Sequence, residues 1–434
     1  MRVFSSTKQR ASFGSISFNW PDLHLSNKYD RIFLVLLAVD VVLRLIWLDK
    51  PDGSLIFDEW YYVNVGRVIL GLPQSLGSNG LPPYQNVPIG QDPNHEHLPL
   101  AKLLIALSMH FFGDNAYGWR IPSVILGSFA ILVFYLLLKR LSTYKSIPLL
   151  GAFLFSFDNL VFVHSRIATL DIFTLSFMLL GIYWYFDGHP YLSAFGMTLS
   201  TLCKETGGAG FIIIVIVHAV KFMNEKKPLR WPKFFSWFEK YTATYVLSLL
   251  VILSILDRLW VGYPWAWPHI VNVLNYSSAL VSACPSGIIS CPWQWLVNQV
   301  QIPYLVVNVK VTTGAVTTES NSIYFIGAMN PSILYLTLFA IAYSGYSYLR
   351  QKKSDIALLS LVWFMVSYLP YFPAVLLGHR VTYLFYFLPI VPAVCAAIAY
   401  MIVDQNPPKL IVLVYLIVVL VSFGLMFPFK VFPS

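Results

Sequence analysis

The chain has 434 residues, of which 57% are hydrophobic and only 11% are charged. Soluble globular domains carry about 25% charged residues, so this composition excludes a soluble enzyme. The 29 Lys and Arg outnumber the 20 Asp and Glu, giving a net charge of +9. In a chain built of long apolar runs, such an excess indicates membrane topology, and we expect no nucleic-acid partner.

Long apolar runs recur from residue 31 to residue 427. A helix needs about 20 apolar residues to cross a bilayer core of about 30 Å, so we predict an all-α polytopic membrane protein. Residues 1–30 contain no apolar segment of the signal-peptide kind, so we expect a cytoplasmic tail followed by a first span that acts as its own insertion signal. The runs are 31–48, 98–112, 121–138, 147–163, 168–186, 190–203, 207–222, 241–260, 332–349, 356–371, 382–403 and 410–427.

Four clusters of basic residues predict the orientation of these runs. They lie in the tail and at 139–145, 221–240 and 350–353. Cytoplasmic loops are enriched in Lys and Arg, so all four should face the same side. They do so only if the run 98–112 does not cross. We therefore predict that this short run is a helix lying along the outer surface.

This assignment leaves about eleven transmembrane helices, with the N-terminus inside. Residues 31–427 then form a single transmembrane domain, and its two long loops, 49–120 and 261–331, both lie outside. Neither loop is long enough to hold a separate soluble domain. The outer compartment permits disulfides, so Cys284 and Cys291 in the second loop are expected to pair, with two free thiols as the alternative.

The first candidate site lies ten residues past the first span, at Asp58 and Glu59. Aromatic rings can stack on sugar C–H surfaces while a carboxylate accepts a hydroxyl proton, so the neighbouring Trp60 and Tyr61 favour a sugar site. We predict catalysis by the two carboxylates and substrate binding by the two rings. The competing interpretation is a helix cap, with Asp58 as N-cap and Glu59 in the first turn.

A second polar group, His95, Glu96 and His97, precedes the predicted surface helix, and Lys102 follows inside it. His-Glu-His could bind zinc, but ligands this close in sequence usually need a third partner from elsewhere, so these three are weak metal candidates and we predict no required metal. The alternative is a charged turn that starts the helix. We expect His97 and Lys102 to face the same outer cavity as the first site and to bind substrate.

A third group consists of cations at outer helix ends, namely Arg166, Lys204 and Arg380. Arg is well suited to clamp a phosphate, and ionisable residues at the membrane edge are functional by default. We predict that the three converge on one anion. Asp171, five residues after Arg166, is expected to contribute to substrate binding, although Arg166 and Asp171 could instead form a structural pair.

The chain contains no Gly-rich phosphate loop and no G-x-S-x-G motif. A nucleotide-binding α/β domain has no place in it. An acidic site beside a cationic cluster therefore indicates a sugar donor carried as a lipid phosphate instead of a cytosolic nucleotide sugar.

Five separated motifs resemble the membrane-embedded glycosyltransferases of the protein O-mannosyltransferase type, which have the GT-C fold. The resemblance covers residues 31 to about 400, and the family typically has eleven spans. Its motifs are Phe57-Asp58-Glu59, His97-Leu98-Pro99-Leu100-Ala101-Lys102, Gly113-Asp114-Asn115 with Gly118-Trp119-Arg120-Ile121-Pro122, Ser165-Arg166-Ile167-Ala168 with Leu170-Asp171, and Arg380-Val381-Thr382-Tyr383-Leu384-Phe385-Tyr386.

The resemblance implies inverting transfer of mannose from a dolichyl or polyprenyl phosphate to Ser or Thr of an exported protein. It implies Asp58 as the catalytic acidic residue and Arg166, with Lys204 and Arg380, as holders of the lipid phosphate. The family's His-Pro-Pro-Leu reads His-Leu-Pro-Leu here, and the second outer loop is too short for the sugar-binding-like domain of eukaryotic members.

Two alternatives remain at this point. One is transfer of another sugar from a polyprenyl phosphate to a lipid or glycan, and the other is a transporter or flippase of lipid-linked sugars. In every case we expect a multi-pass protein of the plasma membrane in a prokaryote, or of the endoplasmic reticulum in a eukaryote. The bilayer, the lipid-linked donor and the acceptor are then its partners, and the site faces the external or lumenal side.

Overall fold

The computed structural model describes residues 23–50, 53–225, 228–313, 316–352 and 354–428. Most of the predicted tail, residues 1–22, lies outside the described residues. The helices are α1 (Lys28–Leu45), α2 (Glu59–Leu70), α3 (Leu100–Phe112), α4 (Ala116–Leu141), α5 (Ser146–Ser156), α6 (Asn159–His164), α7 (Asp171–Phe186), α8 (Pro190–Cys203), η1 (Glu205–Gly207), α9 (Gly208–Met223), α10 (Trp231–Leu256), η2 (Asp257–Val261), α11 (Ala266–Ala279), α12 (Pro292–Trp295), α13 (Pro331–Leu334), α14 (Thr337–Ser347), η3 (Tyr348–Lys352), α15 (Asp355–Tyr368), α16 (Tyr371–Leu376), η4 (Leu384–Ile390), α17 (Val391–Gln405) and α18 (Lys409–Leu425).

Six helices in the described ranges are long and apolar enough to cross a membrane, and α3, α5, α7 and α18 are shorter apolar helices. The protein is therefore a mostly helical, multi-pass integral membrane protein. Helix length does not test the predicted count of eleven spans, because some predicted spans, such as α8, are shorter than the six long helices. The six long segments are Ala116–Leu141, Glu205–Met223, Trp231–Val261, Pro331–Arg350, Asp355–Leu376 and Leu384–Gln405.

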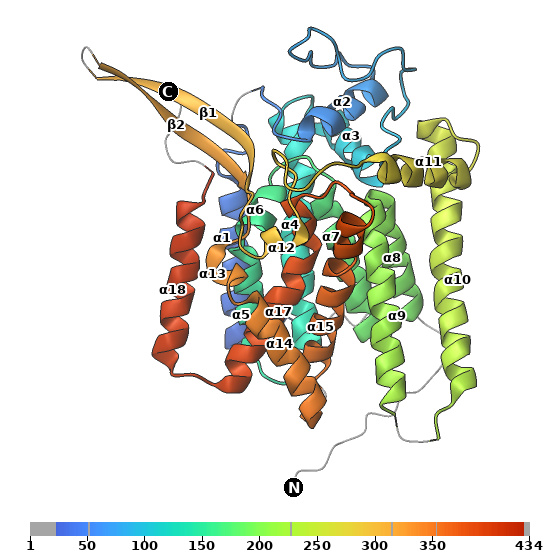
Figure 1. Cartoon of the computed structure of the whole chain (residues 1–434), viewed down its shortest axis with the longest axis vertical. Coiled ribbons are helices and arrows are strands. Elements are labelled where there is room, and N and C mark those ends of the chain that lie inside the picture. Colours follow the sequence, from blue (N-terminus) through green and yellow to red (C-terminus); the bar gives the residue numbers. More distant parts are fainter. Residues whose placement is uncertain (1–22, 51–52, 226–227, 314–315, 353, 429–434) are drawn as a thin grey trace.

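The helices form one bundle, with α10 and α18 at its two flanks (Figure 1). The flanking helices bury little: α10 buries only Tyr241 and Leu253, and α18 only Val419 and Phe423. In the centre, α7 packs between α4 and α8. Helices α2, α3 and α11 gather at one end of the bundle (Figure 1). We call this the α2 end, and the candidate site lies there.

The predicted run 147–163 is not one helix. It divides into α5 and α6 at Asp158, whose carboxylate accepts hydrogen bonds from the backbone N–H groups of Val161 and Asn330. Capping the start of α6 in this way satisfies a helix end inside the bundle, where an unpaired N–H would be costly.

The prediction of an all-α fold is wrong for residues 302–313 and 316–327. Strands β1 (Ile302–Thr313) and β2 (Val316–Gly327) form an antiparallel hairpin whose backbone register places position 310 opposite position 319. The run from Ile302 is rich in Val and Thr and alternates with polar residues toward its end, a pattern that favours a strand. The base of the hairpin enters the bundle, where Tyr304 is buried.

Candidate active site

A polar pocket of about 320 Å³ opens at the α2 end of the bundle. Its walls come from the α1–α2 loop and the start of α2, the loop before α3, the α8–α9 junction, α11 with the loop after it, and the segment that runs into η4. These segments are far apart in sequence, so the pocket exists only after the helices pack. The predicted site residues that line it are Asp58, Tyr61, Glu96, His97, Lys204 and Arg380.

Asp58 stands at the N-cap position of α2, but its side chain makes no capping hydrogen bond. The preceding Phe57 has a φ of 53°, which is unusual for a residue with a side chain and turns the backbone just before Asp58. The carboxylate lines the polar pocket instead. The capping interpretation therefore has no hydrogen bond to support it among the described residues.

Desolvation raises the pKa of Asp58 to about 6. That value also includes the nearby carboxylates of Asp171 and Glu96, which raise the pKa, and Lys204 and His97, which lower it. A carboxylate with a pKa near 6 is a stronger base than an ordinary one and is still ionised at neutral pH. Asp58 is thus suited to accept a proton in the pocket.

Glu59, predicted to be catalytic alongside Asp58, takes a different place. It is fully buried and does not line the pocket. Its carboxylate pairs with the Arg120 guanidinium, with both N···O distances at 2.8 Å, and accepts the N–H groups of Ile56 and Ala168. Successive helix residues point about 100° apart, so only one of two adjacent carboxylates can face the pocket. The placement assigns Glu59 to structure.

Lys204 is buried in the wall of the pocket, where an ion pair and two aromatic rings hold it. Its Nζ lies 2.8 Å from Oδ1 of Asp171 and 5.2 and 5.6 Å from the ring centroids of Phe385 and Tyr386. Next to it, His97 Nδ1 lies 3.0 Å from Oε2 of Glu205. Asp171 therefore orients a cation that the sequence assigned to the phosphate site.

Arg380 supplies the second cation of the pocket, and its Nη1 is buried with no hydrogen-bond partner among the described residues. The backbone around it is fixed, because Val381 N–H donates to Leu280 and Ser282 N–H donates to His379. A guanidinium with unused donors beside a pocket is suited to bind an anion.

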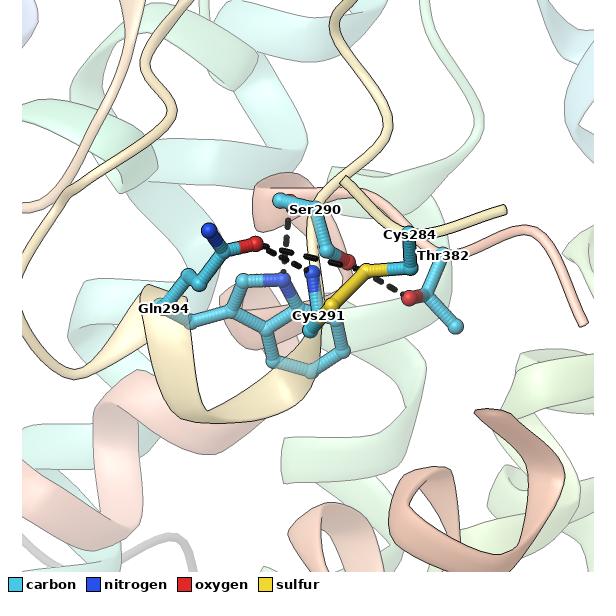
Figure 2. Close-up of a disulfide and its surroundings, with 6 residues drawn as sticks. Cys284, Ser290, Cys291, Gln294 and Thr382 are labelled. Carbon is cyan, nitrogen blue, oxygen red and sulfur yellow. Dashed lines mark hydrogen bonds between the residues drawn. A yellow bond between two sulfur atoms is a disulfide. The ribbon is translucent and has the colours of Figure 1, made fainter. Parts of the chain in front are cut away.

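A disulfide joins Cys284 to Cys291 and closes the loop that lies beside this backbone (Figure 2). The Thr382 hydroxyl donates to the Ser290 carbonyl at 2.6 Å, and Cys291 N–H donates to the Gln294 side chain at 2.8 Å. The bridged loop is thus hydrogen-bonded to the residues that directly follow Arg380. In this way the predicted pair of cysteines secures one wall of the pocket.

Arg166 was predicted as the third member of the cation cluster, but it does not line the pocket. Its guanidinium donates to the Ile46 carbonyl at 2.5 Å and lies over the rings of Phe162 and Phe427. The expected convergence of three cations is wrong in this respect, because packing turns Arg166 toward the end of α1. Two cations, Lys204 and Arg380, share the pocket.

Lys102 and Trp60 were also predicted to bind substrate, but neither of them lines the polar pocket. Lys102 is fully buried, pairs with Asp92 at 2.7 Å and donates to the carbonyls of Asn94 and His97. It therefore shapes the loop that carries His97. Trp60 lines a separate groove, which it shares with Tyr61.

The three weak metal candidates do not act together. His95 Nε2 lies 3.0 Å from the Asp92 carbonyl, whereas His97 pairs with Glu205. Within the described ranges, no three His, Cys, Asp or Glu side chains are grouped to hold a metal ion. The prediction that the protein needs no metal stays a prediction.

The pocket also contains residues that sequence reasoning missed. Tyr276 and Ser277 come from α11, and Leu280 and Ile288 come from the loop that follows. No local pattern marks them, because their role depends on where α11 packs. Tyr383 and Tyr386 belong to a motif already noted in the sequence, and their aromatic character beside Arg380 was the available signal.

A family model described as dolichyl-phosphate-mannose-protein mannosyltransferase matches residues 104–274. A polyprenol-phosphate-mannose–protein mannosyltransferase of Corynebacterium glutamicum is 25% identical, covering 79% of this chain and 76% of the relative. The enzyme of that name from Mycolicibacterium smegmatis is 28% identical over 145 residues, which span 33% of this chain and 26% of the relative.

The fold has solved counterparts. The structure of the S. cerevisiae protein O-mannosyltransferase Pmt1-Pmt2 complex bound to the sugar donor matches with a TM-score of 0.67 at 11% identity, covering 93% of this chain and 90% of that chain. The apo structure of ArnT from Cupriavidus metallidurans matches with a TM-score of 0.54 at 15% identity, covering 86% of this chain and 60% of that chain. At these identities the likeness concerns the fold alone, and both structural neighbours are of the GT-C type. With the family model and the C. glutamicum relative, it makes the chain similar to the dolichyl-phosphate-mannose-protein mannosyltransferases.

Proposed function

We propose that the protein transfers mannose from a polyprenyl or dolichyl phosphate to a Ser or Thr hydroxyl of an exported protein. The observation that carries this proposal is an uncapped carboxylate, Asp58, with a pKa raised to about 6, facing a pocket that also contains Lys204 and Arg380. A base that shares a pocket with two cations is what a sugar-phosphate donor and a hydroxyl acceptor require.

The reaction divides between these groups. Asp58 takes the proton from the acceptor hydroxyl as its oxygen attacks the anomeric carbon, and the bond from that carbon to the phosphate oxygen breaks. Direct displacement from the opposite side inverts the configuration, through a transition state with oxocarbenium character. The departing phosphate keeps the electron pair of the broken bond.

Lys204 and Arg380 stabilise the leaving phosphate. Preorganised cations aimed at developing negative charge are the strongest electrostatic aid to such a step. Arg380 contributes its unused Nη1 donor, and Lys204 is oriented by Asp171. These two charges can stabilise the phosphate without a metal ion, and activity retained in a chelator is the expected result.

The active site faces the external or lumenal side of the membrane in this proposal. The chain crosses about eleven times, with 98–112 as a surface helix and the basic loops in the cytoplasm. The site is then on the same side as the loops 49–120 and 261–331. A translocated polypeptide and a donor whose phosphate lies at the outer leaflet both reach it there.

The decisive experiment supplies purified protein with polyprenyl-phosphate mannose labelled in the sugar, together with a Ser/Thr peptide. Label on the peptide, with the configuration at the anomeric carbon inverted, is the expected result. Label on a lipid or glycan acceptor but never on peptide would refute protein as the acceptor. A donor that stays intact under all conditions would refute glycosyl transfer itself.

A further inference from the structure

A second hollow, of about 700 Å³, lies beside the polar pocket and shares Tyr61 with it. We call it the Trp60 groove. It is lined by Trp60, Tyr61, Leu76, Leu81, Pro82 and Pro83 together with small polar residues. None of the described residues that line it is charged, in contrast to the polar pocket with its carboxylates and cations. The two hollows therefore suit different chemistry.

The groove presents apolar side chains to its surroundings. Leu76 is 63% exposed, Leu81 is 49% exposed and Tyr61 is 48% exposed. Contiguous apolar side chains left uncovered on one surface mark a binding site more often than scattered ones do. Trp60 and the two prolines add flat, rigid surfaces that lose little conformational freedom on binding.

The loop that builds the groove is hydrogen-bonded to the rest of the protein. Gln74 exchanges two hydrogen bonds with the backbone of Tyr84, at 2.8 and 3.2 Å, and Ser75 N–H donates to the Asn64 side chain at 2.9 Å. Gly77 N–H donates to the Leu81 carbonyl at 2.8 Å. The apolar surface is thus held in shape before any ligand arrives, which lowers the cost of binding.

The position of Tyr61 connects the groove to the reaction. Tyr61 follows Asp58 by three residues, and side chains three apart lie on the same face of a helix. Lys204 and Arg380 occupy the polar pocket with Asp58, so the donor phosphate belongs there. The acceptor hydroxyl must approach Asp58 without displacing the donor, and the Trp60 groove leads to Tyr61 from outside the polar pocket.

We propose that the Trp60 groove binds the acceptor polypeptide as an extended segment with apolar residues next to the modified Ser or Thr. This inference rests on the proposed function and adds the site and the chemical class of the acceptor. An uncharged groove lined by Leu, Pro and Trp gives no partner to a charged neighbour, whose desolvation would then go uncompensated. Acceptors with Leu, Val or Pro beside the hydroxyl residue are preferred over acceptors with Lys or Glu there.

The test compares two variants of the same loop. Leu76→Ala with Leu81→Ala removes apolar surface from the groove, and both side chains are exposed enough to be replaced without loss of the fold. Ile89→Ala is the matched control, because Ile89 is 78% exposed in the same loop but does not line the groove. We measure KM and kcat for a peptide with apolar flanks and for a peptide with charged flanks, and KM for the donor.

The double variant should raise KM for the peptide roughly tenfold, since two leucine contacts are lost, with kcat and donor KM unchanged. It should also remove the preference for apolar over charged flanks, and Ile89→Ala should change nothing. An unchanged peptide KM, or a shift in donor KM, would overturn the inference. Transfer of labelled mannose to the peptide by the wild type keeps the two proposals separate, because its absence would count against the proposed function, whereas an unchanged peptide KM in the double variant counts against the groove alone.

Discussion

Replacement of Asp58 by Asn separates catalysis from stability. Asn has the shape of Asp but cannot accept the acceptor proton, so turnover should fall by a factor on the order of 10² to 10⁴. A capping Asp replaced by Asn would leave both properties almost unchanged, since Asn caps about as well. The absence of a capping hydrogen bond at Asp58 makes the structural role small from the outset.

The stability of the variant can be worked out from the pKa. The rise from 3.8 to about 6 corresponds to roughly 3 kcal/mol of unfavourable free energy for the ionised form. The folded protein holds this proton more tightly than the unfolded chain, so stability is lost as pH rises from about 4 to about 6. Asp58→Asn removes the charge and should stabilise the fold by up to about 3 kcal/mol above pH 6, less where water screens the carboxyl.

The assay is turnover of polyprenyl-phosphate mannose by detergent-solubilised protein, with thermal unfolding measured at about pH 7.5 and about pH 4. Asp58→Asn should show the large loss of turnover given above. It should melt at or above the wild type at the higher pH, and the difference in melting temperature should disappear at the lower pH. Near-normal turnover would refute the assignment of Asp58 as base. A melting temperature well below the wild type would refute the structural reasoning.

The neighbouring carboxylate provides the control. Glu59→Gln leaves Arg120 buried with a neutral partner in place of a carboxylate 2.8 Å away, and breaking a buried ion pair costs about 3–5 kcal/mol. This variant should lose stability first, and any activity it loses should follow the loss of folded protein. A stable Glu59→Gln variant without turnover would return Glu59 to the catalytic group.

Three further predictions concern pH, donor binding and topology. The value of kcat/KM should rise with pH through about 6 as Asp58 ionises and becomes a base, and a profile that is flat from pH 5 to 7 would contradict this. Arg380→Ala should weaken donor binding about 10- to 100-fold, since a charge-assisted phosphate contact contributes roughly 1.5 to 3 kcal/mol. Arg166→Ala should lower the melting temperature and leave donor affinity unchanged. Equal losses of donor affinity in the two variants would restore the three-cation cluster. A cysteine placed at exposed Ser78 should react with an impermeant thiol reagent from outside intact cells and one placed at exposed Lys145 should not, so labelling at both positions would overturn the proposed orientation.

The local sequence was informative wherever a segment's own residues determine its secondary structure and whether it crosses the membrane. Each membrane-spanning helix must itself be long and apolar, so the polytopic class could be predicted without knowing which helices contact one another. The hairpin β1–β2 does not follow from the apolar runs, because its Val- and Thr-rich alternation lies inside a long loop between two of them. The short motif around Asp58 marked the site for a similar reason, since its acidic and aromatic residues are adjacent in sequence.

Tertiary structure decided which members of each candidate group meet. Asp58 and Glu59 carry the same functional group and are adjacent in sequence. At the start of α2, however, the Asp58 carboxylate faces the polar pocket and the Glu59 carboxylate pairs with Arg120. Arg166 and Arg380 are both cations at helix ends, yet only Arg380 faces the pocket. Sequence alone determined that this is a membrane protein with an acidic, aromatic and cationic site, because bilayer crossing and residue chemistry are properties of single segments. The composition of the pocket depends on how segments hundreds of residues apart pack against one another, and only the folded chain determines that.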